Sequence, residues 1–347
     1  MIQEKICTFV VPCYKSAAYM EKCIDSILPG GDDIEILIID DGSVGDDTGA
    51  IADRYAAAYP GVVQAVHKEN GGHGSGINCG IERASGRYFK VVDSDDWLDA
   101  EALPAVLDFL RAQPDSGVDM LVTDYRYEHA ETDSTYTVDY RNVFPTDRLF
   151  GWDDMLGNFR PWQYMMMHSV IYRTAVLREC GVRLPEHTFY VDNLFMYAPF
   201  PYVHTIYYMN IPLYHYFIGR SDQSITERAM SERVGQQHLV TELMMHAADL
   251  PAIRQQSKAL FRCMKHELAM MFLISTIFTH ISRKTTPDRA PDNYRRLRGL
   301  WRDLKESSPK TYRLLRYRTL TSSIAAFMPR HMLLFGYRRL SGILKYN

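Results

Sequence analysis

Short apolar runs alternate with segments of helical spacing through the first third of the chain, and this alternation constrains the fold more than any other feature. A helix between successive strands is the pattern of βαβ units, whose strands pair in parallel and whose helices cover both faces of the sheet. We therefore expect an α/β fold with a Rossmann-like, mostly parallel sheet, in which ligands bind beyond the carboxyl ends of the strands. The predicted strands cover residues 6–11, 34–39, 62–67, 88–92 and 120–125, and the predicted helices cover 17–28, 46–59, 76–84 and 99–112.

Length, charge and cysteine usage narrow the class of protein. At 347 residues the chain exceeds a usual single domain, so we expect a catalytic domain with a smaller appendage. The net charge of −3 gives no reason to expect a nucleic-acid partner. The six cysteines are scattered without a CxxC pair, which disfavours a zinc site or a disulfide framework and favours a reducing cytoplasm. No apolar stretch reaches the roughly 20 residues of a membrane-spanning helix.

Three of the predicted strands end in polar or turn-forming residues. The sequences are PCY at 12–14, DDGS at 40–43 and DSDD at 93–96. Each alone also fits a strand-to-helix turn, because Asp, Gly and Ser favour turns and helix caps. The last holds three carboxylates in four residues, which repel one another unless a cation is present. Such oxygen ligands suit Mg²⁺ or Mn²⁺.

A glycine-rich segment, KENGGHGSGIN at 68–78, opens the third predicted helix. Glycines at a helix start let the backbone and a phosphate approach closely. The segment fits neither the GxGxxG dinucleotide pattern nor the phosphate loop that ends in Gly-Lys-Ser/Thr. This argues against a dehydrogenase and against a P-loop nucleotide hydrolase.

Taken together, VPCY, DDGS, ENGG, the following NCG and ASGRY, and DSDD resemble family 2 glycosyltransferases in order and spacing. The resemblance covers residues 5–225 and implies the GT-A fold and an inverting enzyme of the bacterial polysaccharide type. We expect a catalytic domain at 1–225. We expect a helical C-terminal region with a basic amphipathic end at 226–347, with a loop at 287–291.

The resemblance also implies a donor site and a metal site that holds Mg²⁺ or Mn²⁺. Asp95 is the preferred direct metal ligand, with Asp93 serving the ribose or the metal. His215 either joins the metal or is a packed strand residue. The residues implied to bind the nucleotide sugar are Pro12, Tyr14, Asp40, Asp41, Asn70, Gly71, Asn78, Asp93, Ser94 and Arg220.

Asp192 is the implied catalytic base. It matches the Asp of a Glu-Asp-x-x-Phe motif in which Val191 replaces the Glu. An inverting transfer needs one base to take the acceptor proton, and a single carboxylate is sufficient. The alternative is that Asp192 caps the following helix. A second departure is Ile77, because many relatives carry Arg at this position.

Two further regions concern the acceptor and the membrane. Trp162 and Gln163 occupy the region where relatives contact the acceptor, and Arg220 is implied to fold over the diphosphate. Residues 310–347 hold eight Lys or Arg and no acidic residue, with apolar residues interleaved. Such a helix either lies on an anionic membrane surface, where lipid-linked acceptors sit, or packs against protein as a solvated helix or dimer contact.

The leading functional hypothesis is therefore a metal-dependent transferase that moves a sugar from a nucleotide diphosphate donor, with UDP the commonest in relatives, to a glycan or lipid-linked acceptor. It would work in the cytoplasm, in solution or on the inner face of the membrane. A sugar nucleotidyltransferase would instead need a Gly-rich basic loop after the first strand, where this chain has PCYKSAA. A degenerate nucleotide-sugar-binding partner of another transferase is the third hypothesis, favoured by Val191 and Ile77.

Overall fold

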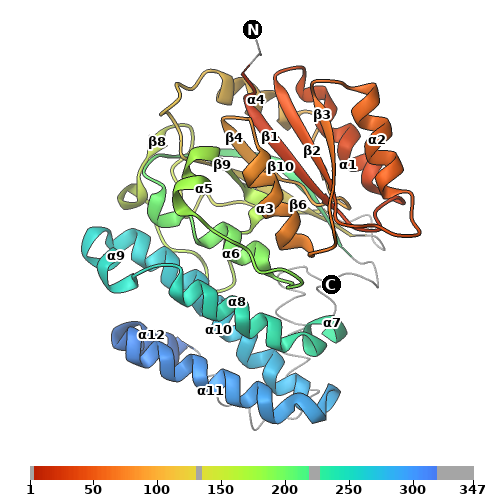
Figure 1. Cartoon of the computed structure of the whole chain (residues 1–347). Helices are drawn as coiled ribbons and strands as arrows, with labels where there is room; N and C mark the ends of the chain where they lie inside the picture. Colours follow the sequence, from red (N-terminus) through yellow and green to blue (C-terminus); the bar gives the residue numbers. More distant parts are fainter. Residues whose placement is uncertain (1–3, 130–134, 219–226, 319–347) are drawn as a thin grey trace. The chain divides into compact units, whose positions relative to one another are not determined.

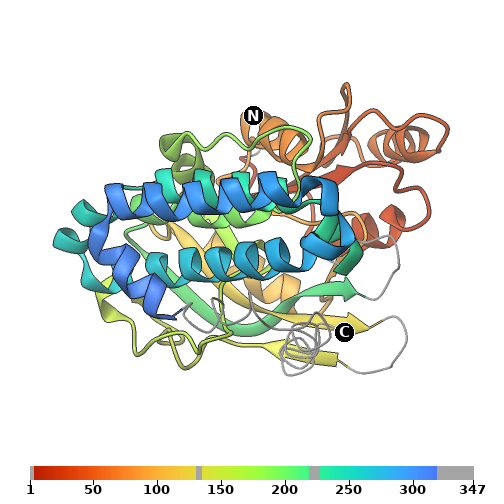
Figure 2. The same cartoon turned by 90° about the horizontal axis from the view of Figure 1, so that it is seen from below.

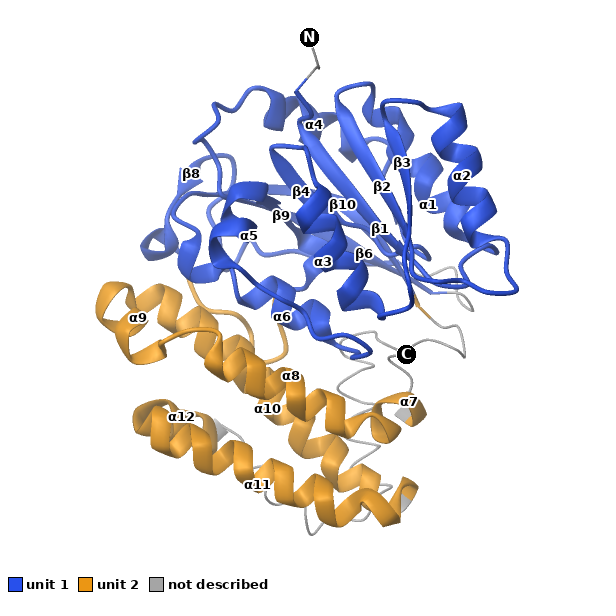
Figure 3. Cartoon of the chain, in the orientation of Figure 1, with its two compact units in different colours: residues 1–156, 166–217 blue, residues 157–165, 218–347 orange. Residues whose placement is uncertain are grey.

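The computed structural model describes residues 4–129, 135–218 and 227–318, and the chain divides into two compact units. Unit 1 comprises 1–156 and 166–217, and unit 2 comprises 157–165 and 218–347 (Figure 3). The short segment 157–165 thus groups with the C-terminal helices although it lies between two stretches of unit 1. The expected boundary at residue 225 falls within 219–226, outside the described residues, and stays a prediction.

Unit 1 is built on one sheet with strand order β3-β2-β1-β4-β9-β6-β10-β5, with β7 paired to β6 and β8 to β10. The first four strands pair in parallel, as expected for βαβ units. The pairs of β4 with β9, β6 with β9 and β10 with β5 are antiparallel. The parallel part of the sheet therefore ends at β4. The strands are β1 Cys7–Cys13, β2 Ile34–Asp40, β3 Val63–His67, β4 Tyr88–Val91, β5 Trp97–Leu98, β6 Met120–His129, β7 Thr135–Val138, β8 Leu149–Phe150, β9 Val170–Arg173 and β10 Ile206–Ile218.

Helices of unit 1 cover the sheet on both faces (Figure 1). Every residue of β1 and β2 is buried, which explains why these strands appear in the sequence as continuous apolar runs instead of alternating ones. The α/β prediction is therefore confirmed. The helices are α1 Met20–Ile27, α2 Thr48–Ala58, α3 His73–Arg83, α4 Ala102–Arg111, α5 Thr174–Cys180 and α6 Val191–Tyr197, with 3-10 turns η1 Leu28–Gly30, η2 Trp152–Asp154, η3 Met167–Ser169 and η4 Phe200–Tyr202.

Helix α3 packs unusually close to β1. A Cβ atom added at Gly80 would lie 2.6 Å from the methyl groups of Val10, and one added at Gly76 would lie 3.1 Å from Cβ of Pro12. The glycines on this face of α3 therefore permit the close approach. As a result the first residue of the helix, His73, reaches the carboxyl ends of the central strands.

From residue 227 to 318, unit 2 is built of helices. Its longest helices, α10 and α11, run side by side (Figures 1 and 2). Buried hydroxyl groups link α8 to α10, with Thr241 Oγ1 2.9 Å from Ser275 Oγ. In place of the expected loop at 287–291 the chain makes a 3-10 turn, η5 Pro287–Arg289, and enters the next helix. The helices are α7 Glu227–Glu232, α8 Val234–His246, α9 Leu250–Gln256, α10 Lys258–Thr285, α11 Ala290–Ser307 and α12 Pro309–Arg318.

Among the described residues, none of the helices combines the length and the apolar character that crossing a bilayer requires.

Candidate active site

The carboxylates that follow β4 are held in place by the last long strand of the sheet. Asp96 is buried, and its Oδ2 accepts a hydrogen bond from the hydroxyl of Tyr214 on β10 at 2.6 Å. Its Oδ1 accepts from the backbone N–H of Phe217 at 2.8 Å. Burial, together with the charges of Asp95 and Asp93, raises the pKa of Asp96 well above its usual range. Asp96 is therefore a carboxyl group that a nearby cation would help to ionise.

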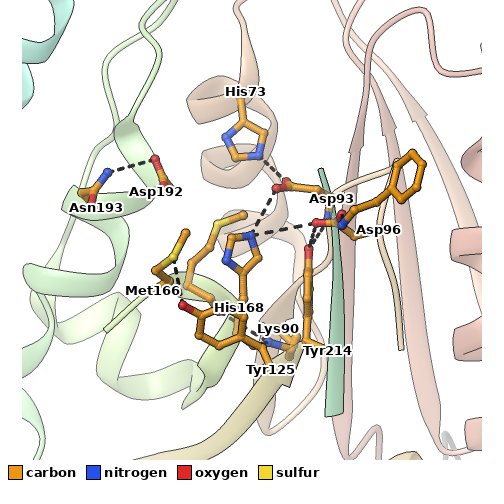
Figure 4. Close-up of polar contacts among 12 residues, drawn as sticks. His73, Lys90, Asp93, Asp96, Tyr125, Met166, His168, Asp192, Asn193 and Tyr214 are labelled. Atoms are coloured by element: carbon orange, nitrogen blue, oxygen red, sulfur yellow. Dashed lines mark hydrogen bonds and ion pairs between the residues drawn. The ribbon is translucent and has the colours of Figure 1, made fainter. Parts of the chain in front are cut away.

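Two histidines face Asp93 from different parts of the fold (Figure 4). Asp93 Oδ1 lies 2.8 Å from Nε2 of His73 at the start of α3, and Asp93 Oδ2 lies 3.8 Å from Nε2 of His168 in η3. Burial opposes the ionisation of Asp93, but the two imidazoles outweigh it and hold the pKa of this carboxyl below its usual range. Burial likewise opposes protonation of His73, yet the carboxylates of Asp93, Asp192 and Asp95 raise its pKa.

Asp93, Asp96 and His168 form a group that fits a divalent metal ion. Each offers one ligand atom, and these atoms lie within 4.8 Å of one another. The ring of His168 is buried, and neither of its nitrogens has a hydrogen-bond partner within the part of the chain that the structure describes. A buried polar atom without a partner costs free energy that a bound cation would recover. Carboxylate oxygens with one imidazole suit Mn²⁺.

His168 is fixed in place by aromatic rings and by a buried lysine. Its ring stacks on Tyr216 with centroids 4.3 Å apart and contacts Tyr214 at 4.7 Å. Below it, Nζ of Lys90 donates a hydrogen bond to the backbone carbonyl of His168 at 2.7 Å. Lys90 is fully buried, and burial lowers its pKa to about 7. Neither His168 nor Lys90 was a predicted site residue, because a His in the run MMMHS and a Lys inside a strand match no motif.

Asp192, the predicted base, lies in the first turn of α6 and faces the same group (Figure 4). The residue before the helix, Tyr190, adopts φ 67° and Val191 opens the helix, so the helix starts abruptly. One oxygen of Asp192 accepts a hydrogen bond from the side-chain amide of Asn193 at 3.3 Å. Burial raises the pKa of Asp192, although the charges of His168 and His73 partly oppose this. A carboxylate with a raised pKa is a stronger proton acceptor, as a general base requires.

Asp41 anchors the glycine-rich loop. Its carboxylate accepts hydrogen bonds from Lys68 Nζ at 2.6 Å and from the backbone N–H groups of Gly71 and Gly72 at 2.9 and 2.7 Å. It also accepts one from the side chain of Asn70 at 3.1 Å. The structure thus brings together three residues predicted to bind the donor, Asp41, Asn70 and Gly71. Within the chain they shape the loop that leads into α3.

Two other residues predicted to bind the nucleotide sugar, Asp40 and Asn78, make polar contacts within the chain. Asp40 Oδ1 accepts from the backbone N–H of Ser43 at 3.0 Å, and its Oδ2 lies 3.0 Å from Nδ1 of His67. Although burial opposes ionisation, these contacts lower the pKa of Asp40. The side-chain amide of Asn78 makes two hydrogen bonds to the backbone of Leu184, at 2.9 and 3.0 Å. Asn78 therefore braces the segment that leads to Asp192.

The remaining residues at the strand ends differ in exposure. Ser94 is buried with its Oγ 2.8 Å from Oγ of Ser16, and Pro12 is buried within β1. Tyr14 is half exposed, so its ring is available to stack on a planar ligand. Asp95, the predicted direct metal ligand, is partly buried, and its charge contributes to the raised pKa of Asp96.

His215 has partners other than the metal group. Its Nδ1 lies 2.7 Å from Glu128 Oε1 and its Nε2 lies 3.1 Å from Asp99 Oδ2, while its ring stacks on Trp97. The structure therefore gives both ring nitrogens carboxylate partners apart from Asp93 and Asp96, and metal ligation by His215 stays a prediction. The predicted diphosphate ligand Arg220 lies outside the described residues.

Trp162 and Gln163, the predicted acceptor residues, belong to unit 2. The backbone carbonyl of Gln163 accepts a hydrogen bond from Nε2 of His266 on α10 at 2.6 Å. Two residues on, the N–H of Met165 donates to Oε1 of Glu267 at 3.0 Å. Adjacent side chains of α10 therefore hold segment 157–165, while Trp162 is 39% exposed.

Comparisons with known proteins agree with this architecture. Residues 8–175 match the protein family described as glycosyl transferase family 2. The chain is 28% identical over 229 residues to the putative glycosyltransferase EpsH of Bacillus subtilis, covering 64% of this chain and 62% of EpsH. It is 25% identical over 256 residues to the glycosyltransferase GlyA of Streptococcus pneumoniae, covering 67% of this chain and 35% of GlyA. The matched part thus spans less than two thirds of the length of either relative.

Solved structures show the same fold at low sequence identity. The structure of S. aureus TarS 1–349 in complex with UDP-GlcNAc has a TM-score of 0.64 at 18% identity, over 96% of this chain and 92% of that chain. The mannosyltransferase PcManGT from Pyrobaculum calidifontis, in complex with GDP-Man and Mn²⁺, has a TM-score of 0.50 at 14% identity, over 92% and 86% of the two chains. With the sheet, the acidic strand end and the family match in agreement, residues 8–175 of this chain form a family 2 glycosyl transferase domain, and the chain has the GT-A fold.

Proposed function

We propose that this protein is an inverting, metal-dependent glycosyltransferase that moves a sugar from a nucleotide diphosphate donor to an acceptor hydroxyl in the assembly of a surface polysaccharide. The observation that carries the proposal is the group of Asp93, Asp96 and His168, with Asp192 close enough for its charge to act on His73. EpsH and TarS, as similar proteins, support the reaction class, and the ligand named with TarS supports a UDP-sugar donor.

Asp93, Asp95 and Asp96 with His168 would hold Mg²⁺ or Mn²⁺, and His215 remains a further candidate. When bound, a divalent cation neutralises the negative charge of the diphosphate. The loop anchored by Asp41 presents backbone N–H groups at the start of α3, where a phosphate binds well. Tyr14 would stack on the base.

Asp192 would act as the base in a single displacement. The acceptor hydroxyl attacks the anomeric carbon, its proton passes to a carboxylate oxygen of Asp192, and the bond from that carbon to the diphosphate oxygen breaks. Because the pKa of Asp192 is raised, the rate should begin to fall on the acidic side at a pH above the usual pKa range of an aspartate. Trp162 and Gln163 would contact the acceptor, and Arg220 the diphosphate.

The acceptor is proposed to be a glycan or a lipid-linked sugar, which would place the protein at the inner face of the membrane. The support is the basic C-terminal sequence, of which residues 310–318 belong to α12.

The proposed reaction is tested with a panel of nucleotide sugars, by measuring nucleoside diphosphate release with Mn²⁺ and with EDTA. We expect one donor to be turned over only with metal. Asp192→Asn should abolish transfer yet keep donor binding, and Asp153→Asn, the same substitution at an exposed aspartate outside the site, is the matched control. Transfer by Asp192→Asn at the wild-type rate would remove the base assignment.

The other two hypotheses give different results in the same assay. Pyrophosphate release from a nucleoside triphosphate and a sugar phosphate would indicate a nucleotidyltransferase. Donor binding, seen as a rise in melting temperature, without turnover of any donor would indicate a degenerate binding partner.

A further inference from the structure

The start of α12 borders a pocket in which every charged side chain is cationic. Arg254 of α9 and Lys310 and Arg313 of α12 line it, together with Phe261, Ser308 and Thr311, around a volume of about 480 Å³. The pocket lies wholly within unit 2. Three cations around one hollow repel each other, so an anion bound among them would lower the free energy.

The three cations differ from Arg228, Arg295 and Arg302 of the same unit in their lack of acidic partners. Within the described ranges, Arg254, Lys310 and Arg313 form no ion pair with a carboxylate. By contrast, Arg228, Arg295 and Arg302 pair with Glu232, Asp292 and Asp303 at 2.9, 2.9 and 3.1 Å. The charge at the pocket is thus uncompensated by the chain itself.

The helix end adds to the preference for an anion. Helix α12 begins at Pro309 and spans ten residues, so its first N–H groups have no acceptor within the helix. These groups and the positive end of the helix dipole favour a negatively charged ligand. A phosphate group, with several acceptor oxygens, matches both the cations and the N–H donors.

Apolar residues accompany the charges. Leu314 is 44% exposed, and it shares a face of α12 with Lys310 and Arg313 because these residues are three and four positions apart. Phe261 lines the pocket beneath the guanidinium of Arg254, 5.5 Å from the ring centroid. A free phosphate gains nothing from these side chains, whereas a lipid headgroup brings acyl chains that an exposed leucine can reach.

We propose that this basic pocket, formed by Arg254, Lys310 and Arg313, binds the phosphate group of an anionic lipid headgroup and so holds unit 2 on a membrane surface. The inference rests on the membrane location in the proposed function and not on the transfer reaction. It identifies a phosphate site within the described residues, in addition to the basic sequence further along the chain.

The test is co-sedimentation of the full chain with vesicles of phosphatidylglycerol mixed with phosphatidylcholine, against vesicles of phosphatidylcholine alone. We expect binding only to the anionic vesicles. Arg254→Ala/Lys310→Ala/Arg313→Ala should weaken it roughly a hundredfold, from the contribution of each cation at an anionic surface. The matched control, Arg228→Ala/Arg295→Ala/Arg302→Ala, removes the same charge from ion-paired positions and should weaken binding far less. Equal losses in the two variants would overturn the proposal.

Two more measurements separate the sources of phosphate and the proposed reaction. If inorganic phosphate alone raises the melting temperature of the wild type but not of the pocket variant, and both bind vesicles equally, the pocket is a site for free phosphate and the lipid proposal is wrong. Metal-dependent donor turnover, assayed without vesicles, should be equal in the wild type and the pocket variant. Vesicle binding that fails while this turnover is kept contradicts only the membrane site. Since three substitutions together can unfold α12, the single substitution Lys310→Glu, checked by circular dichroism, is the second variant, and it should also lose vesicle binding.

Discussion

Glu267 allows a quantitative test of how burial controls ionisation in unit 2. Only 2% of this residue of α10 is exposed, and its Oε1 accepts a hydrogen bond from Met165 N–H at 3.0 Å. Burial raises its pKa from 4.5 to about 8, and the hydrogen bond from Met165 opposes this only in part. The folded protein therefore keeps the proton of Glu267 over a pH window in which the unfolded chain has lost it.

Within that window the folded state binds more protons, so the free energy of unfolding falls as pH rises from 4.5 towards 8 and is constant above it. The free energy of unfolding changes by about 1.36 kcal/mol for each pH unit below the folded pKa, so it falls by about 3 kcal/mol between pH 6 and pH 9. Glu267→Gln keeps an oxygen for Met165 and removes the titration. We expect the variant to gain about 3 kcal/mol over the wild type between these two pH values.

The assay is urea unfolding followed by helical circular dichroism at pH 6 and pH 9, with the stability difference between the two proteins compared at each pH. Glu306→Gln, at an exposed position on α11, is the matched control and should show the same difference at both pH values. A difference between Glu267→Gln and the wild type that does not change with pH would refute the reasoning about burial.

Three further predictions follow from contacts described above. Gly80→Ala should destabilise the protein by about 1–3 kcal/mol, because its Cβ would lie 2.6 Å from Val10. Gly299→Ala in α11, where the added Cβ would have open space around it, should stabilise the protein by about 1 kcal/mol. Thermal unfolding compares the two variants. Asp41→Ala removes the acceptor from two backbone N–H groups and should cost about 1–3 kcal/mol for each group left buried, measured by urea unfolding and by faster proteolysis near the glycine-rich loop. His168→Phe keeps the aromatic packing but removes the ring nitrogens, so the Mn²⁺ concentration for half-maximal turnover should rise by about tenfold or more, and an unchanged requirement would exclude His168 as a ligand.

The parallel half of the fold could be predicted because its signals are local. A run such as that of β1 or β2 shows in the sequence as a buried strand. The glycines of α3 were expected to let a phosphate approach the backbone, whereas in the structure Gly76 and Gly80 permit the close packing of α3 on β1. The antiparallel half was not anticipated as such, because the pairing of β9 with β4 and β6 joins segments that are far apart in the chain. Nothing in the local pattern of Val170–Arg173 specifies these neighbours or their direction.

The candidate site shows the same division. Asp93 and Asp192 belong to recognisable motifs, and the structure brings both towards His73. His168 and Lys90 act through tertiary packing against aromatic rings and backbone carbonyls, which the sequence does not display. Asp41 matches a motif expected to bind the donor, yet in the structure its carboxylate holds the loop.

The chain enters the helical unit twice, once through 157–165 and once from 218 onward. An enzyme of this design cannot have gained its present helical unit simply by adding a module to its end, since a stretch inside the catalytic sequence depends on His266 and Glu267. An exchange of the helical unit with that of a related enzyme should therefore succeed only if both stretches are exchanged together. A fragment that ends at residue 225 would keep Trp162 and Gln163 but lose the side chains that hold them.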